Sequence, residues 1–177
     1  TGHVTIPAQN GGPLDTGNVF TLRVQIRRLR TGIEAFIGRQ GNNYAIQCTP
    51  NDFIQLVGTV SNVMTSASAI TDKKIHTIVW SRTSSLVNAL YLDGVDVSSS
   101  ITNDTIVTGG YIEFGGNGNQ INNYTGDIQD ASIYNRALSA DEVKWLYEEP
   151  YAMFRGPEIM RRYWVFGAGA SARRRFA

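Results

Sequence analysis

Residues 126–147 read GDIQDASIYNRALSADEVKWLY, and this stretch predicts a strand, a tight corner and a capped helix. Ser139 can accept a hydrogen bond from a free N–H group of the first helical turn, and Glu142 can accept one from the amide of Ser139. This capping box predicts that the helix begins at Ser139. Leu138 and Val143 flank the cap and can close over it as a hydrophobic staple.

Pro150 is expected to end this helix, because the residue before a proline is disfavoured in helical geometry. The residues in front of the helix predict a strand, but its apolar members do not alternate cleanly: they are Ile128, Ala131, Ile133 and Tyr134. A strand alternates with a period of two, so the break in the pattern indicates a β-bulge near Gln129 and Asp130.

The clearest strand runs from Phe20 to Arg27, where apolar residues alternate with Thr21, Arg23, Gln25 and Arg27. The alternation predicts one face in the core and the other in water. Asp93-Gly94 is a strong hairpin signal. Other short strands are expected at Val4–Ile6, Glu34–Gly38, Tyr44–Cys48, Asp52–Thr59, Ile75–Arg82, Leu86–Leu92, Val95–Val97 and Tyr111–Phe114. This rhythm predicts an all-β, antiparallel two-sheet jelly-roll sandwich with one short helix.

Composition narrows the class of protein. A chain of 177 residues can bury one sizeable core, and its net charge of +1 argues against a general nucleic-acid binder. Cys48 is the only cysteine, so no intrachain disulfide is possible. No apolar run approaches the roughly 20 residues that cross a bilayer, so no membrane span is expected.

The order of these segments resembles the laminin-G-like branch of the concanavalin A-like jelly rolls. The resemblance rests on FTLRVQIRR (20–28), the strand–turn–strand IHTIVWSRTSSLVNALYLDGVDV (75–97), and YIEFGG (111–116) followed by GDIQDASIYNRALSADEV (126–143). It implies a jelly-roll domain over residues 1–149 that lacks the family's first strand. Residues 150–177 are then expected to form a separate, basic and aromatic docking arm.

The residues after the helix resemble the ends of laminin-G-like domains in tailed-bacteriophage virion proteins. Glu149–Arg155 and RRYWVFGAGASARRRF (161–176) carry this resemblance. It implies a structural or interaction module of a phage tail, fibre or capsid decoration, assembled in the host cytoplasm. The lack of disulfides fits a reducing compartment. The alternative is an extracellular, calcium-assisted carbohydrate-binding module.

The C-terminal segment combines apolar and basic residues. From Arg155 onward there are six Arg and one Glu, a surplus of five positive charges, so residues 1–154 carry about −4 of the total +1. Soluble monomers seldom expose a large apolar patch, so the segment either folds back over the outer sheet or docks on a neighbouring subunit. The predicted assembly interface comprises Tyr151, Phe154, Arg161, Arg162, Tyr163, Trp164 and Phe166.

Two loops carry the chemistry of sugar binding, in which aromatic faces stack on sugar rings and amides meet hydroxyls. The candidate glycan ligands are Asn42, Asn43, Tyr44, Asn117, Asn119 and Tyr124. The alternative is that the Asn residues serve turn geometry and that Tyr44 belongs to the core.

Calcium prefers several oxygen ligands at one rim, and Asp15, Asp104 and Asp127 are the loop carboxylates proposed for it. These residues can equally cap turns.

A catalytic pair is not predicted. Glu113 has no acid two residues away, and Asp127 and Asp130 are three apart, which places them on opposite faces of a regular strand unless a bulge intervenes. His76 is expected to be hydrogen-bonded at the sheet surface, and it has no metal-ligand spacing. The sequence therefore predicts a protein that is not an enzyme.

Overall fold

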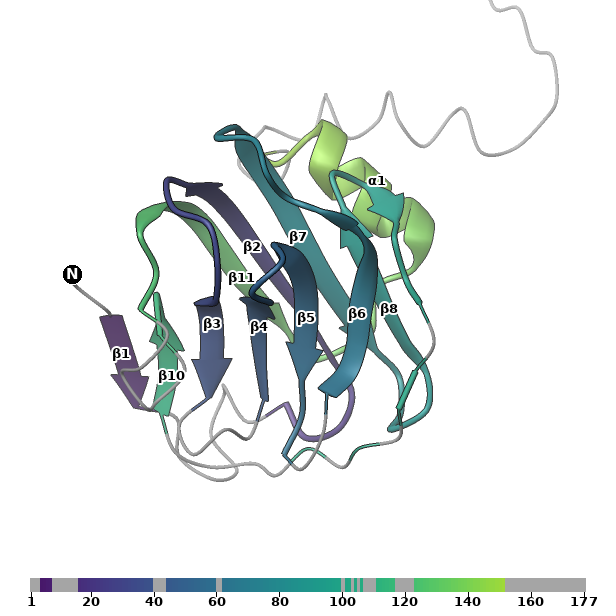
Figure 1. The fold of residues 1–177 in the computed structure, drawn as a ribbon. Coiled ribbons are helices and arrows are strands. Elements are labelled where there is room, and N and C mark those ends of the chain that lie inside the picture. Colours follow the sequence, from purple (N-terminus) through teal and green to yellow (C-terminus); the bar gives the residue numbers. More distant parts are fainter. Residues whose placement is uncertain are drawn as a thin grey trace, which may run out of the picture.

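The computed structural model describes residues 4–7, 16–39, 44–59, 62–99, 101–102, 104, 106, 111–116 and 123–151. Over these residues the chain forms two antiparallel β-sheets packed face to face, with a single helix on the outer side of one sheet (Figure 1). The predicted antiparallel sandwich is confirmed. Nowhere in the described residues is there a helix long and apolar enough to cross a lipid bilayer.

The six-stranded sheet has the order β1-β10-β3-β4-β5-β6. Its strands are β1 (Val4–Pro7), β10 (Tyr111–Phe114), β3 (Glu34–Arg39), β4 (Tyr44–Cys48), β5 (Phe53–Val57) and β6 (Asn62–Ala69). The predicted edge strand at Val4 and Ile6 is confirmed. Strand β6 was not predicted, because NVMTSASA is built mainly from small and polar residues of low strand propensity.

The five-stranded sheet has the order β11-β2-β7-β8-β9. Its strands are β11 (Gly126–Tyr134), β2 (Phe20–Arg28), β7 (Ile75–Arg82), β8 (Asn88–Leu92) and β9 (Val95–Asp96). Asp93 and Gly94 join β8 to β9 with φ values of 52° and 77°. Positive φ at both positions is the geometry of a type I′ hairpin turn, so the predicted hairpin is confirmed.

The core lies between the sheets. Phe20, Leu22, Val24 and Ile26 of β2 are fully buried in it, as their alternation predicts. Trp80 of β7 is also buried and meets Phe20 edge to face, with ring centroids 5.1 Å apart. The inward face of β2 therefore organises the core.

The outer face of β2 differs from the prediction that it lies in water. Thr21 and Arg23 are buried, and only Arg27 is well exposed. The Thr21 hydroxyl donates to the Arg136 carbonyl and accepts from the Leu138 amide, both at 2.9 Å. The corner that leads into the helix therefore covers this end of the strand.

Helix α1 (Ala140–Glu148) has the predicted capping box. Ser139 Oγ accepts from the Glu142 amide at 3.3 Å, and Glu142 Oε2 accepts from the Ser139 amide at 2.9 Å. Val143 and Leu146 pack with Leu138 in a second apolar cluster against the outer face of β7 and β8. This cluster confirms the staple and attaches the helix to the five-stranded sheet.

Candidate functional site

A groove opens between the two sheets along one side of the sandwich, where β1 and β10 face β11. Its volume is about 680 Å³, and apolar side chains contribute much of its lining: Val4, Ile6, Phe114, Tyr124, Ile128 and Ala131. The remaining lining residues include Thr125, Gly126, Gln129 and Asp130. We call this feature the edge groove. Figure 1 shows the three strands that border it, at the purple N-terminal edge of the sandwich.

One wall of the edge groove comes from β1. Val4 and Ile6 alternate with Thr5 and Pro7, so their side chains point to the same side of the strand. Val4 is 62% exposed and Ile6 is 38% exposed. Burying such a side chain stabilises a protein by roughly 1.5–3 kcal/mol, so this wall offers apolar surface that a bound partner could cover.

The opposite wall is β11. Its register with β2 shifts between Ile128 and Asp130, which confirms the predicted bulge. Ile128 and Ala131 pack partly against the core. In the described part of the chain β11 pairs only with β2, so its other edge has no strand partner there. An unpaired edge presents backbone N–H and C=O groups that can bind an added strand.

The bulge turns two acids toward the outer face of the sheet. Asp127 accepts from Arg27 Nε at 2.8 Å, and Asp130 forms an ion pair with Arg23. Arg23 and Arg27 are four residues apart on β2 and share one face, so Asp127 and Asp130 share it as well. The bulge is the exception that the sequence analysis allowed, and it brings onto one face two acids that a regular strand would place on opposite faces. Each carboxylate is bound to its own arginine.

Tyr124 lies at the base of the edge groove and is almost fully buried. Its hydroxyl lies 2.6 Å from the carbonyl of Arg27 and 3.1 Å from that of Asp127. Its ring meets Phe36 edge to face at 5.4 Å. Burial, with the nearby charges of Glu34 and Asp127, raises the pKa of the Tyr124 hydroxyl above its ordinary value. The Tyr124 hydroxyl therefore contacts the backbones of both β2 and β11.

Tyr44 is a core residue as well. It is 1% exposed, stacks on Phe20 with centroids 5.3 Å apart, and meets Trp80 edge to face. Packing therefore covers both rings, as the alternative of Tyr44 as a core residue predicts, and sugar stacking by Tyr44 or Tyr124 stays a prediction. The four asparagines predicted with them lie outside the described residues: Asn42, Asn43, Asn117 and Asn119.

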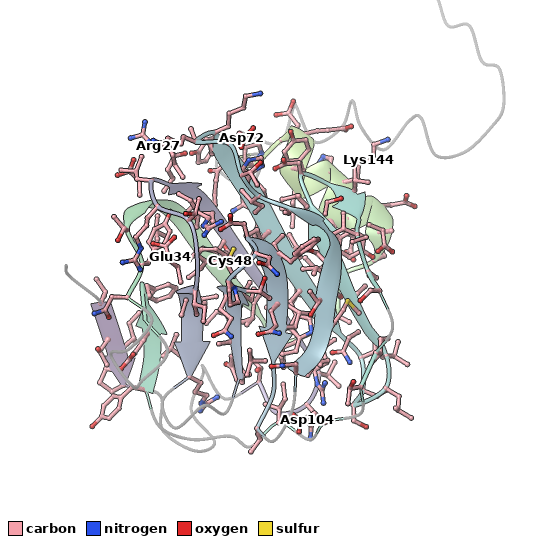
Figure 2. All side chains as sticks on the ribbon, in the orientation of Figure 1. Arg27, Glu34, Cys48, Asp72, Asp104 and Lys144 are labelled. Atoms are coloured by element: carbon pink, nitrogen blue, oxygen red, sulfur yellow. The ribbon has the colours of Figure 1, made fainter. Side chains whose placement is uncertain are left out.

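Two of the predicted calcium ligands, Asp104 and Asp127, lie at opposite ends of the sandwich and do not share one site. Asp127 pairs with Arg27 near the C-terminal end of β2, whereas the Asp104 carbonyl accepts from Arg82, which lies opposite Phe20 at the other end of β2. Figure 2 labels Arg27 and Asp104 at opposite ends of the sandwich. Asp15 is outside the described residues. Within the described ranges no group of three His, Cys, Asp or Glu residues could hold a metal ion.

A buried charge cluster beside the groove was missed from the sequence. Arg28 donates to Glu34 at 3.1 Å, to Asp52 at 3.0 Å and to the carbonyls of Gly32 and Ile70. Glu34 in turn accepts from the Thr125 amide at 2.8 Å. The signal was present, since position 28 continues the inward-facing series of β2 that begins at Phe20. A charged residue in such a series needs a buried partner.

Only one member of the predicted assembly interface, Tyr151, lies within the described residues. Tyr151 is 53% exposed just after α1. The other predicted members lie outside the described residues: Phe154, Arg161, Arg162, Tyr163, Trp164 and Phe166.

Glu113, the acid of β10, is buried opposite Thr5 and Gly38 of the neighbouring strands.

Comparison with known proteins identifies a family. The model of the concanavalin A-like lectin/glucanases superfamily matches residues 1–144, most of the chain. A comparison with curated proteins finds no matching sequence.

Several solved structures share the fold at low sequence identity. A heptameric SAP-like pentraxin from Limulus polyphemus superposes with a TM-score of 0.64 at 16% identity, over 82% of this chain and 75% of the pentraxin. Domain 4 of an extracellular arabinanase from Geobacillus stearothermophilus, in complex with arabinotriose, gives 0.60 at 18% identity, over 75% and 69%. Trypanosoma rangeli sialidase gives 0.63 at 16% identity, over 86% of this chain but only 26% of the sialidase.

Proposed function

The chain belongs to the concanavalin A-like lectin/glucanase superfamily, and on this basis we propose that it is a non-catalytic interaction module of a multisubunit assembly. The observation that supports this function is the edge groove. It combines exposed apolar side chains on β1 with an edge of β11 that pairs with no strand of the described ranges. An extended polypeptide can add to such an edge through its backbone and place alternate side chains in the groove.

The occupant that we propose is the segment 150–177 of a neighbouring copy of the chain. Its aromatic residues match the apolar lining, and its surplus of five positive charges is opposite in sign to the about −4 of residues 1–154. The assembly that we propose is a bacteriophage particle, because residues after the helix resemble the ends of laminin-G-like domains in virion proteins. In that setting the groove would join adjacent subunits.

The size of the protein in solution tests this proposal. The full chain should form a defined oligomer, whereas a chain truncated after Phe154 and a Val4→Asp, Ile6→Asp variant should both be monomeric. Val95→Asp is the matched control, because Val95 is 64% exposed on β9, at the opposite edge of the five-stranded sheet. It should leave the oligomer intact.

Two results would contradict the proposal. The full and truncated chains could be compact monomers of equal stability, or the Val95 variant could dissociate the oligomer as effectively as the β1 variant. A monomeric full chain that is more stable than its truncated form would instead indicate that the segment folds back on its own domain.

A carbohydrate-binding module, assisted by calcium, is the second candidate. The structural neighbour in complex with arabinotriose favours it. A glycan array with and without calcium tests it. A specific signal that is lost on substitution of Asn42 and Asn43, or of Asn117 and Asn119, would favour the lectin function over the docking function.

A further inference from the structure

His76 of β7 is held between two carboxylates at one end of the five-stranded sheet. Its Nδ1 lies 2.7 Å from Asp93 Oδ2, and its Nε2 lies 2.6 Å from Asp72 Oδ1. Asp72 lies in the turn between β6 and β7, and Asp93 lies in the turn between β8 and β9. The imidazole, which is 14% exposed, therefore joins two turns whose aspartates are 21 residues apart in sequence.

Both ring nitrogens of His76 must donate in this arrangement. An ionised carboxylate can only accept hydrogen bonds, and a neutral imidazole carries a single N–H. The geometry therefore requires the imidazolium form. Burial by itself would lower the pKa of His76, but the hydrogen bonds and charges of Asp72 and Asp93 outweigh it and raise that pKa.

The two carboxylates differ in how firmly they are held. Asp93 Oδ1 also accepts from the Thr77 amide at 2.8 Å, which fixes it to the backbone of β7. The other partners of Asp72 belong to its own turn: it bonds to the backbone of Lys74 and lies 3.7 Å from the ammonium of the same residue, which is 80% exposed. Asp72 is therefore the carboxylate that can move away.

The remaining neighbours of His76 add little opposing charge. On β2, its register partner is Ile26, and the adjacent Arg27 is paired with Asp127. In the β8–β9 hairpin, the carboxylate of Asp96 accepts from the Ser98 amide. Helix α1 reaches this hairpin through Tyr147, which packs on Gly94 next to Asp93.

We propose that His76 is a pH-sensitive clasp between the β6–β7 turn and the β8–β9 turn. When the ring is protonated, it binds both aspartates. When Nε2 loses its proton to solvent, the ring keeps the Nδ1–H bond to Asp93, and its Nε2 lone pair faces the carboxylate of Asp72. The β6–β7 turn is then released.

The β8–β9 turn, which keeps its bond to His76 in both protonation states, also contacts the helix. Gly94 in that turn supports Tyr147 of α1, four residues before Tyr151, where the described part of the chain ends. A group whose pKa is raised on folding stabilises the protein below its unfolded pKa, which is about 6.5 for histidine. That stabilisation is lost as the pH rises through the folded pKa, so the clasp should open as the pH passes that raised pKa.

Nuclear magnetic resonance of the imidazole nitrogens and of the backbone amides tests the clasp. At pH 6 the His76 ring should carry both N–H protons, and its pKa should lie above 6.5. Asp72→Asn and Asp93→Asn should each lower that pKa by about one unit or more, because an opposite charge at this range shifts a pKa by about 1–3 units. The amides of the β6–β7 turn should shift along the same titration curve.

Asp96→Asn is the matched control, because it removes a charge from the same hairpin but not a partner of the ring. It should leave the His76 pKa nearly unchanged. The proposal fails if the wild-type ring titrates at or below pH 6.5, if Asp96→Asn lowers the pKa as much as Asp72→Asn, or if the turn amides do not follow the ring. Asp72 lies in an exposed turn, so Asp72→Asn should remain folded, and the pKa of His76 can be measured in the folded variant.

Discussion

Tyr147, in the last turn of α1, packs directly on the backbone of Gly94 in the β8–β9 turn. A Cβ atom placed on Gly94 would lie 3.1 Å from Cδ1 and 3.2 Å from Cβ of Tyr147. Gly94 also has a φ of 77°, in the left-handed region that favours glycine. One glycine therefore serves both the turn of the hairpin and the seat of the helix.

Gly94→Ala is expected to destabilise the protein more than Gly17→Ala. Both sites have positive φ, which costs a residue with a Cβ about 1–2 kcal/mol, but a Cβ on Gly17 meets no atom within 4 Å. The excess loss at Gly94 should shrink when Tyr147→Ala is added, because that variant removes the ring atoms near Gly94 and keeps only the Cβ atom. Free energies of unfolding from denaturant titration provide the comparison, and equal losses at the two glycines would contradict the contact.

Ser139→Ala should destabilise the protein by about 1 kcal/mol, because it removes the N-cap of α1.

Glu142→Gln should change the stability of the protein by an amount that depends on pH. The hydrogen bond from Arg136, followed by the Ser139 amide, lowers the pKa of Glu142 to about 2. A carboxylate with a lowered pKa stabilises the fold above its unfolded pKa of about 4.3 and loses that effect as the pH falls toward 2.

The stabilities of wild type and Glu142→Gln should therefore converge near pH 2 and differ at neutral pH. Glu148→Gln, at the other end of the helix, is the control, because Glu148 takes no part in the capping box. Thermal unfolding measured across pH would show this, and a constant difference between wild type and Glu142→Gln from neutral pH down to pH 2 would contradict it.

Glu34→Gln is expected to destabilise the protein by up to about 3–5 kcal/mol, because it removes one of the two carboxylates that pair with the buried Arg28 and leaves that guanidinium with Asp52 alone. Asp127→Asn breaks the Arg27–Asp127 pair, in which both side chains are 47% exposed, and should cost about 0–1 kcal/mol. Chemical denaturation of the two variants compares a buried pair with an exposed one. Similar losses would mean that the Arg28 cluster does not behave as a buried ion cluster.

Cys48 should resist thiol reagents while the protein is folded. Burial raises the pKa of its thiol to about 12, and the thiolate is the reactive form. Because Cys48 is the only cysteine, the rate of labelling at pH 8 should rise only as denaturant unfolds the chain. Rapid stoichiometric labelling of the native protein would show that this part of the core opens freely.

The structure confirms the features that arise from neighbours in sequence. Each of these features depends on residues within a few positions of one another, so the sequence alone predicts it. They are the capping box at Ser139, the hairpin at Asp93-Gly94 and the inward face of β2. β6 was missed because its pairing with β5, with Met64 opposite Leu56, depends on the sheet more than on its own residues.

The candidate site shows the opposite situation. Tyr44 and Tyr124 lie next to asparagine-rich stretches typical of sugar-binding loops. In the structure, however, Tyr44 packs against Phe20 and Tyr124 packs against Phe36, so both are core residues. The bulge at Gln129 was predicted, but the arginines that receive Asp127 and Asp130 come from β2, about 100 residues earlier in the chain. Such partners are known only when the strand order is known.

The sequence by itself therefore determined the fold class, the capped helix and the family to which the chain belongs, because local periodicity and capping chemistry carry that information. The tertiary structure decided which side chains remain open to a partner. The edge groove exists because β1 and β11 end the two sheets on the same side, and the His76 clasp exists because two turns meet across β7. Both are contacts between distant segments, and only folding brings those segments together.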